Sequence, residues 1–248
     1  MRTLAAALTL AVLTTTLGAL VLLARLVGVK DGPGTIYEWA PRVWARGILA
    51  ASGVRVVLHH PERARTGEPR IFASNHVSWY DVLVLVAHLP RYSFVAKAEL
   101  FRVPLFGAAA RAVGTIPIDR DNRAAAFQAY QLAAERIRGG RHVVVFPEGT
   151  RGRSYAVRPF KKGPFVLAIA AGVPVVPTLV HGTLEALPRG SLWLRAGRVD
   201  VHFLEPVATA GLGYDARGVI AGRVHDRLAG ELLERYGVAS PAPALAVA

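Results

Sequence analysis

Residues 71–88 read IFASNHVSWYDVLVLVAH, and this stretch decides the fold. Its opening residues, 71–74, predict a short buried strand, and residues 82–88 predict a helix. A strand that leads into a helix through a short polar loop is the repeating unit of an α/β fold. The segment between them holds His76 and Asp81, and loops that follow strands are where α/β sheets handle ligands.

The rest of the chain repeats this alternation of strand and helix. Further strands are predicted at residues 54–58, 94–96, 115–118, 143–146, 173–180 and 199–203, and further helices at 100–112, 123–138, 164–171 and 215–236. Continuous apolar strands that alternate with helices predict a mostly parallel sheet flanked by helices. We therefore expect an α/β domain over residues 53–236 and a flexible C-terminal tail over residues 237–248.

The N-terminus opens with an uninterrupted apolar run. Residues 4–24 carry no charge and lie between Arg2 and Arg25. A membrane-spanning helix needs about 20 such residues, whereas the core of a signal peptide needs about 7 to 15. The run has no convincing small-residue cleavage site, which favours an uncleaved anchor over a cleaved signal peptide. Threonines and a glycine in its middle leave open whether the helix spans the bilayer or lies shallowly in it.

A second N-terminal segment, residues 35–52, combines aromatic and basic residues. Its apolar residues recur near helical spacing, and Trp39, Trp44, Arg42 and Arg46 lie among them. Tryptophan and arginine together suit the headgroup level of a bilayer, although a helix packed on the core is the alternative. Residues 1–52 are therefore expected to form two membrane-associated helices.

The charge balance restricts the class of partner. The chain of 248 residues has 30 Lys and Arg against 17 Asp and Glu, a net charge of +13. Such a balance favours nucleic acid, anionic lipid headgroups or phosphorylated small molecules. The arginines are dispersed and no nucleic-acid-binding motif is present, which argues against nucleic acid. Cysteine is absent, so a thiolate metal site and a cysteine nucleophile are excluded.

His76 and Asp81 are the candidate catalytic pair. A histidine can accept a proton from a hydroxyl, and a carboxylate can fix its tautomer. An offset of five residues on one regular helix would separate the two side chains by about 140°. We therefore expect His76 in the turn and Asp81 in the first helical turn, reaching back. The pair alone is weak evidence, because a histidine before a helix is more often a structural hydrogen-bonding residue.

Residues 146–151, Phe-Pro-Glu-Gly-Thr-Arg, end another apolar strand. Gly149 permits a close backbone approach, and the planar fork of Arg151 suits phosphate. Glu148 and Thr150 can hydrogen-bond substrate hydroxyls or neighbouring loops. The alternative is a turn that a glutamate–arginine pair stabilises.

Basic residues at two further places follow or precede predicted elements. Arg120 comes just beyond the strand at residues 115–118, and Lys161 and Lys162 precede a helix. The N-terminus of a helix itself favours anions. Ordinary solvent-exposed charges are the alternative at each of these positions.

Taken in order, these blocks closely resemble the lysophospholipid acyltransferase superfamily, in particular bacterial 1-acyl-glycerol-3-phosphate acyltransferases. That family has an Asn-His-x4-Asp block, a Gly-x-Ile-x-Ile-Asp-Arg block, a Phe-Pro-Glu-Gly-Thr-Arg block and a Val-Pro-hydrophobic-hydrophobic-Pro block. The sequence has all of them in the same order, at residues 75–81, 114–120, 146–151 and 173–177. Ordered blocks are far more specific than any single one.

The resemblance implies roles for individual residues. His76 is similar to the base that deprotonates an acceptor hydroxyl, and Asp81 to the residue that orients it. The set that resembles the acceptor-binding residues for glycerol phosphate is Arg120, Glu148, Gly149, Thr150 and Arg151. Lys161 or Lys162 would match a further lysine. The family also has an N-terminal two-helix membrane motif, which fits residues 1–52.

The reaction that the resemblance implies is direct acyl transfer. The donor would be acyl-CoA or acyl carrier protein, and the acceptor the sn-2 hydroxyl of 1-acyl-glycerol-3-phosphate, giving phosphatidic acid. A thioester is already activated, so neither a metal nor an organic cofactor is expected. Because such donors are cytosolic, we expect the domain to face the cytoplasm on the inner membrane, held against anionic lipids.

Four alternatives stay open at this point. The acceptor can be lyso-ornithine lipid or another lysophospholipid, and a covalent route through Ser74 or Ser78 is chemically conceivable. A membrane-tethered binder of polyanions is a third interpretation. A metal-dependent phosphate hydrolase is the fourth, although the sequence indicates no second cluster of histidine and carboxylate beside His76 and Asp81.

Overall fold

The computed structural model describes residues 1–119 and 122–242. They form one seven-stranded sheet with the order β1-β7-β6-β2-β5-β3-β4. The strands are β1 Val54–His59, β2 Ile71–Ser74, β3 Tyr92–Lys97, β4 Ile116–Ile118, β5 His142–Val145, β6 Val175–His181 and β7 Gly197–Phe203. Every strand that the sequence predicts is present.

The sheet is mostly parallel, as predicted, with one antiparallel pairing. β6 and β7 pair antiparallel, whereas β1 pairs parallel with β7, and the remaining neighbours are parallel. An antiparallel pair does not need the long crossover that a parallel pair requires. The connection between β6 and β7 accordingly holds only a one-turn helix, α7 Thr183–Ala186, which the sequence did not predict.

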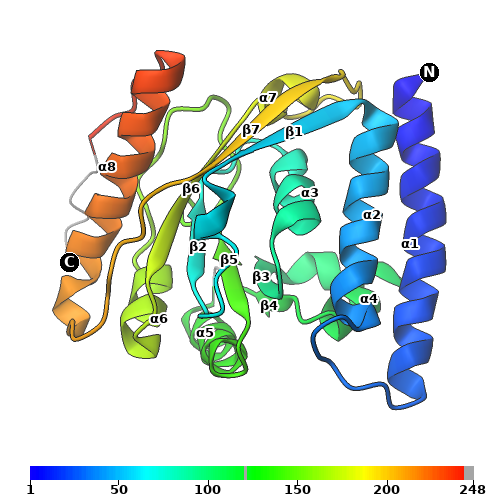
Figure 1. The fold of residues 1–248 in the computed structure, drawn as a ribbon, viewed down its shortest axis with the longest axis horizontal. Coiled ribbons are helices and arrows are strands. Elements are labelled where there is room, and N and C mark those ends of the chain that lie inside the picture. The colour runs from blue at the N-terminus through cyan, green and yellow to red at the C-terminus, as the bar shows by residue number, and fades with distance from the viewer. Residues whose placement is uncertain (120–121, 243–248) are drawn as a thin grey trace.

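Helices cover both faces of the sheet (Figure 1). One face carries α2 Ile36–Ser52 and α3 Trp79–His88, and the other carries α5 Arg123–Arg138, α6 Gly163–Ala171 and α8 Arg217–Tyr236. Successive residues of a strand point to opposite faces. Ile71 and Ala73 therefore pack on the α5, α6 and α8 side, and Phe72 packs on the α2 and α3 side.

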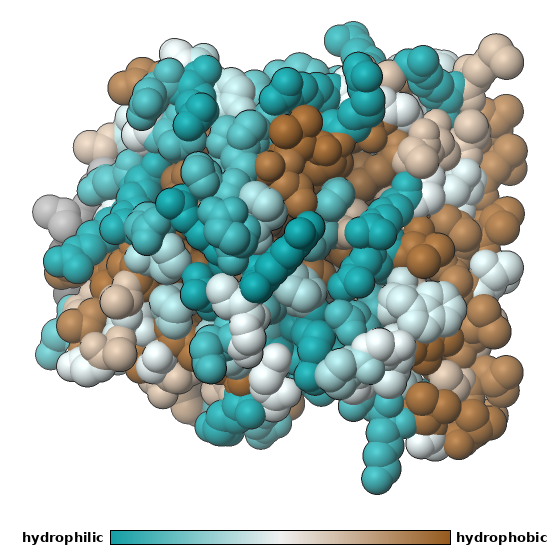
Figure 2. Space-filling model, viewed as in Figure 1, coloured by the Kyte–Doolittle hydropathy of each residue, from teal (hydrophilic) through white to brown (hydrophobic). Residues whose placement is uncertain are grey.

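The N-terminal helix α1, Arg2–Leu26, lies along α2 and also contacts α4, Phe106–Ala112. Trp44 Nε1 donates a hydrogen bond to Thr14 Oγ1 at 2.9 Å, and Val21 is buried beside Tyr37. The opposite side of α1 is an exposed apolar band (Figure 2). Among the described residues, α1 is the helix that is long and apolar enough to cross a membrane.

Residues 100–112, predicted as one helix, form two shorter ones. The 3-10 helix η2 covers Ala98–Arg102, and α4 begins only at Phe106. Pro104 lies in the break, and Leu105 has a φ of 61°. Proline lacks an N–H and disfavours helical backbone at the residue before it, which explains the interruption. Two further 3-10 helices are η1 Pro61–Arg63 and η3 Tyr214–Ala216.

The tail expected to be flexible, residues 237–248, is packed in its described part. Ser240 Oγ accepts a hydrogen bond from Val157 N at 2.9 Å, and Val238 packs against the core. Val238 buries apolar surface next to α8 in this way, and the flexibility expected of residues 237–248 stays a prediction. Residues 243–248 lie outside the described residues.

Candidate active site

The loop between β2 and α3 is built by the cap of the helix. Ser78 is the N-cap of α3, and its Oγ accepts a hydrogen bond from Tyr80 N at 3.3 Å. Asp81, the third helical residue, reaches back to accept from Ser78 N at 2.8 Å. This is a capping box, in which the two ends of the first turn satisfy each other's backbone N–H groups. The cap that starts the helix therefore turns Asp81 toward the loop.

Asp81 is fully buried and accepts hydrogen bonds on both oxygens. Its Oδ2 accepts from His76 Nδ1 at 2.9 Å and from Val77 N at 2.7 Å, besides Ser78 N. Its Oδ1 accepts from Thr183 Oγ1 at 2.5 Å. The geometry expected from the five-residue offset is confirmed, with His76 in the loop and Asp81 in the first helical turn.

His76 presents one ring nitrogen to Asp81 and leaves the other available. The ring stacks on Phe146, with 4.0 Å between ring centroids and 16° between planes. Nδ1 faces the carboxylate, and no described residue forms a hydrogen bond with Nε2. An imidazole whose Nδ1–H points at a carboxylate carries its lone pair on Nε2. The arrangement can therefore accept a proton at Nε2.

Glu148 holds the loop that carries His76 through a hydrogen bond to its backbone. Its Oε1 accepts from His76 N at 2.9 Å, and its Oε2 accepts from Arg158 Nε at 2.8 Å. Burial raises the pKa of Glu148 above its usual range, although both hydrogen bonds act in the opposite direction. Gly152 N also donates to His76 O at 2.7 Å. Both oxygens of Glu148 are thus engaged by protein groups rather than left free for an acceptor hydroxyl.

Arg151 lies above the indole of Trp79, the first residue of α3. Its guanidinium carbon is 4.7 Å from the ring centroid, and Trp79 itself is 45% exposed. Arg189, which the sequence did not point to, donates from Nη1 to Arg151 O at 2.9 Å. Burial and the neighbouring charge of Arg189 lower the pKa of Arg151. Two cationic side chains therefore meet beside the helix start that carries Asp81.

The remaining predicted acceptor residues surround the end of β5. Gly149 has a φ of 78°, and a Cβ there would lie 2.9 Å from Lys161 Cε. Lys161 is exposed and lines a mainly apolar pocket with Phe146, on which His76 stacks. Lys162 is the N-cap of α6, and Thr150 is exposed. Arg120 lies outside the described residues.

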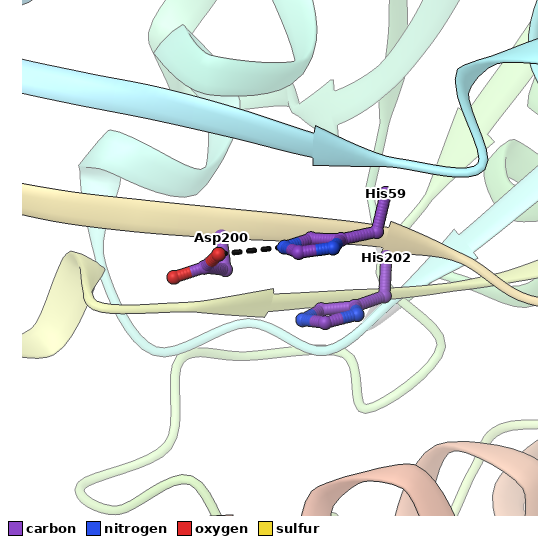
Figure 3. A group of neighbouring side chains, drawn as sticks. All are labelled: His59, Asp200 and His202. Carbon is purple, nitrogen blue, oxygen red and sulfur yellow. Dashed lines mark hydrogen bonds and ion pairs between the residues drawn. The ribbon is translucent and has the colours of Figure 1, made fainter. Parts of the chain in front are cut away.

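The structure also contains a cluster of histidine and carboxylate away from His76 and Asp81, which the sequence did not indicate. His59 Nε2 lies 2.6 Å from Asp200 Oδ1, and His202 stacks on His59 with 4.1 Å between the ring centroids (Figure 3).

The ligand atoms of His59, Asp200 and His202 lie within 4.8 Å of one another, close enough in distance for a metal ion. The imidazole planes, however, are only 3° apart, so their in-plane lone pairs do not converge on one point. Arg198 also binds both oxygens of Asp200. As arranged, these residues do not fit a metal.

The second cluster is separate from His76. It joins β1 to β7, and β6 lies between β7 and β2. The sequence missed it because it depends on the register that places His59 opposite His202. The same holds for Thr183, which follows the fourth block but becomes visible only when α7 is placed against α3.

Comparison with known proteins identifies acyltransferases as relatives of this chain. The Acyltransferase family model matches residues 55–181. The chain is 30% identical over 194 residues to a 1-acyl-sn-glycerol-3-phosphate acyltransferase of Haemophilus influenzae, covering 77% of this chain and 80% of that protein. It is 36% identical over 140 residues to the chloroplastic 1-acyl-sn-glycerol-3-phosphate acyltransferase BAT2 of Brassica napus. That alignment covers 56% of this chain and only 41% of the length of the plant relative.

The fold also matches a solved structure. The crystal structure of the 1-acyl-sn-glycerophosphate (LPA) acyltransferase PlsC from Thermotoga maritima superposes with a TM-score of 0.75 at 24% identity, covering 95% of this chain and 99% of that one. The agreement extends over nearly the whole of both chains, so the architecture of sheet and helices is shared. The family match over residues 55–181 and the relative from Haemophilus influenzae show that the chain belongs to the Acyltransferase family.

Proposed function

We propose that this protein transfers a fatty acyl group from a thioester donor, acyl-CoA or acyl carrier protein, to the sn-2 hydroxyl of 1-acyl-glycerol-3-phosphate. The product is phosphatidic acid. The observation that carries the proposal is the buried Asp81, which holds Nδ1 of His76 and leaves Nε2 without a partner among the described residues. Relatives that are named as 1-acyl-sn-glycerol-3-phosphate acyltransferases support the choice of acceptor.

The reaction follows from this geometry as a direct displacement. His76 Nε2 takes the proton of the acceptor hydroxyl as that oxygen attacks the thioester carbonyl carbon. The tetrahedral intermediate then collapses, the carbon–sulfur bond breaks, and the imidazolium returns the proton to the leaving thiolate. One ester forms and one free thiol is released. General-base catalysis of this kind contributes about 10²- to 10⁴-fold to the rate.

Asp81 supports the base without exchanging the proton itself. Its carboxylate favours the tautomer with the proton on Nδ1 and stabilises the imidazolium that forms. The capping box and the hydrogen bond from Thr183 keep the carboxylate in one orientation. No step needs a metal ion or an organic cofactor, because the thioester is already activated.

The phosphate of the acceptor is bound by arginine. Arg151 offers a planar fork beside the helix start, and Arg189 adds a second guanidinium next to it. A phosphomonoester can receive bidentate hydrogen bonds from such groups, and its negative charge relieves the repulsion between them. Lys161 or Lys162 and Arg120 complete the proposed set, as the family pattern implies. Glu148 acts by positioning the His76 loop rather than by contacting the acceptor.

The protein works at a membrane surface, with α1 in contact with lipid. The outer side of α1 is exposed and apolar, and the loop after α7 adds Leu192 at 83% and Trp193 at 76% exposure. Leu194 N donates to Thr3 Oγ1 at 3.1 Å, which joins this loop to the start of α1. Arg189 and Arg195 flank the exposed pair, and arginines suit anionic headgroups. The domain faces the cytoplasm on the inner membrane.

An assay with the purified protein tests the chemistry. Lysophosphatidic acid and acyl-CoA, with a chelator present, should give phosphatidic acid and free thiol in equal amounts. Lyso-ornithine lipid and neutral monoacylglycerol are offered in parallel. Faster transfer to one of these would change the acceptor, whereas metal-dependent phosphate release, or no transfer to any lysolipid, would contradict the proposal.

A protease-protection experiment tests the orientation in the membrane. The domain should be protected in intact spheroplasts and digested in inverted membrane vesicles. Digestion in intact spheroplasts would contradict a cytoplasmic domain.

A further inference from the structure

Asp81 is held by a residue that none of the four sequence blocks contains. Its Oδ2 receives three donors, but its Oδ1 receives only the hydroxyl of Thr183, at 2.5 Å, among the described residues. Both side chains are completely buried, at 0% exposure. Thr183 lies 102 residues further along the chain, at the first position of α7. The contact therefore brings a separate element against the catalytic loop.

The backbone on both sides of Thr183 is fixed by one phenol oxygen. Tyr155 OH accepts from Gly182 N at 2.7 Å and from Leu184 N at 2.9 Å, and it donates to Glu185 Oε2 at 2.6 Å. Gly182 has a φ of 97°, and a Cβ there would lie 2.2 Å from Arg198 O. Only glycine fits that position. The turn that carries Thr183 is thus held in place independently of Asp81.

A buried carboxylate oxygen without a donor is costly, and the group would rotate or draw in water to satisfy it. Rotation of Asp81 about its Cβ–Cγ bond would move Oδ2 away from His76 Nδ1. The Thr183 hydroxyl opposes this rotation, because it binds the other carboxylate oxygen, Oδ1. It also carries no charge, so it fixes the carboxylate without forming an ion pair that would compete with the imidazolium.

We propose that Thr183 is a positioning residue of the His76–Asp81 pair, acting through Asp81 on the tautomer and direction of the His76 ring. This inference rests on the proposed function, in which His76 is the base. Thr183 does not touch the substrate. Its effect is expected in the chemical step rather than in acceptor binding.

The test compares Thr183→Val with Thr183→Ser in the full-length protein. Valine keeps the shape of threonine and removes the donor, whereas serine keeps the donor. Loss of the hydrogen-bond partner that orients a metal-binding histidine typically costs about 10- to 100-fold in activity, and we expect the same range for a group that orients His76 through Asp81. We expect that decrease in kcat for Thr183→Val, with KM for lysophosphatidic acid unchanged, and we expect Thr183→Ser to restore most of the rate.

Thr209→Val is the matched control. Thr209 is also buried, and its hydroxyl donates to Val173 O at 2.8 Å, away from His76 and Asp81. It should lose thermal stability and keep kcat. If Thr209→Val lost kcat to the same extent, or if a folded Thr183→Val kept the wild-type kcat, the proposal would be overturned.

Two arrangements keep the test decisive. If Thr183→Val does not fold, Thr183→Cys takes its place, because a thiol is a weak donor. A kcat equal to that of Thr183→Ser would then count against the proposal.

A ¹⁵N spectrum of the histidines reports the His76 tautomer without turnover, and Thr183→Val should reduce the share of the Nδ1–H form. Absence of acyl transfer in the wild-type protein would refute the proposed function instead, and leave that spectrum as the measure of Thr183.

Discussion

Among the described residues, two histidines form hydrogen bonds with an aspartate through opposite ring nitrogens. His76 turns Nδ1 to Asp81, so Nε2, the nitrogen farther from the backbone, is left for a substrate. His59 turns Nε2 to Asp200, so only the nitrogen next to its own backbone is left. A base has to reach a proton on another molecule, and only the first arrangement presents its lone pair outward. Contact between histidine and aspartate is therefore not by itself a sign of catalysis.

The two carboxylates also differ in what else they bind. Apart from His76, the described residues that donate to Asp81 are two backbone N–H groups and one hydroxyl. Asp200 is bound through both oxygens by Arg198. Burial raises the pKa of Asp200, but the hydrogen bonds from Arg198 and His59 outweigh it, and the pKa is lowered overall. Among the described residues Asp81 thus forms no ion pair with an arginine or lysine, whereas Asp200 is paired with Arg198.

Replacing each histidine should give the largest contrast. His76→Ala removes the proposed base, and we expect kcat to fall by about 10³-fold or more, near the upper range for general-base catalysis. His59→Ala should keep kcat within about threefold, because the principal loss is a cross-strand contact. Acyl transfer by both purified variants, with a thermal melt to show folding, measures this. Equal losses would remove the distinction between the pairs.

Replacing each aspartate should give a smaller contrast in the same direction. Asp81→Asn can present its amide N–H₂ to Nδ1 and favour the wrong tautomer, so we expect kcat to fall by about 10²-fold or more. Asp200→Asn breaks the ion pair with Arg198 and should change the melting temperature rather than kcat. An Asp81→Asn variant that is folded and fully active would contradict the proposed role of Asp81.

Arginine variants test whether the charges near the first pair bind phosphate. Arg151→Gln and Arg189→Gln each remove a charge-assisted hydrogen bond, and we expect KM for lysophosphatidic acid to rise by about tenfold. Arg198→Gln removes the same charge beside the second pair and should leave KM unchanged. Arg195→Gln controls for the charge of the loop itself. A matching rise in KM for neutral monoacylglycerol would argue against phosphate binding.

The smallest expected effect is on the pH dependence of stability, through His202, which stacks on His59 of the second pair. Burial and the neighbouring His59 lower the pKa of His202 to about 4. The folded state then keeps His202 neutral between about pH 6.5 and pH 4, while the unfolded state binds a proton there, so stability falls as pH decreases. The slope from one such group is at most about 1.4 kcal/mol per pH unit. Denaturant unfolding across this range should show a shallower slope for His202→Gln. An unchanged slope would show that His202 is not the group responsible.

The sequence predicts best what neighbouring residues determine. The helix at residues 123–138 has the predicted bounds because its signals are local. Asn122 accepts from Ala125 N at the start, and Gly139 follows the last turn. The position of His76 relative to Asp81 was predictable for the same reason, since Asp81 belongs to the capping box that starts α3 and His76 lies two residues before its N-cap, Ser78.

What depends on distant placement was not predictable. The residues of β7 do not indicate in which direction the strand runs, and its antiparallel pairing with β6 is visible only in the register of the two strands. Thr183 reaches Asp81 across 102 residues, and Glu148 reaches His76 N across 72. The sequence shows that Thr183 and Glu148 are polar, but it does not show which hydrogen bonds they form. The role of Arg120 stays a prediction.

The hydrogen bond between Trp44 and Thr14 sets which side of α1 faces α2. Inserting one residue after Thr14 would turn the rest of the helix by about 100° relative to the domain. In the membrane placement proposed above, this fixed angle determines which way the catalytic loop faces in the leaflet. The enzyme then meets its acceptor by lateral diffusion, so the search takes place in two dimensions and the acyl chain of the substrate never has to enter water.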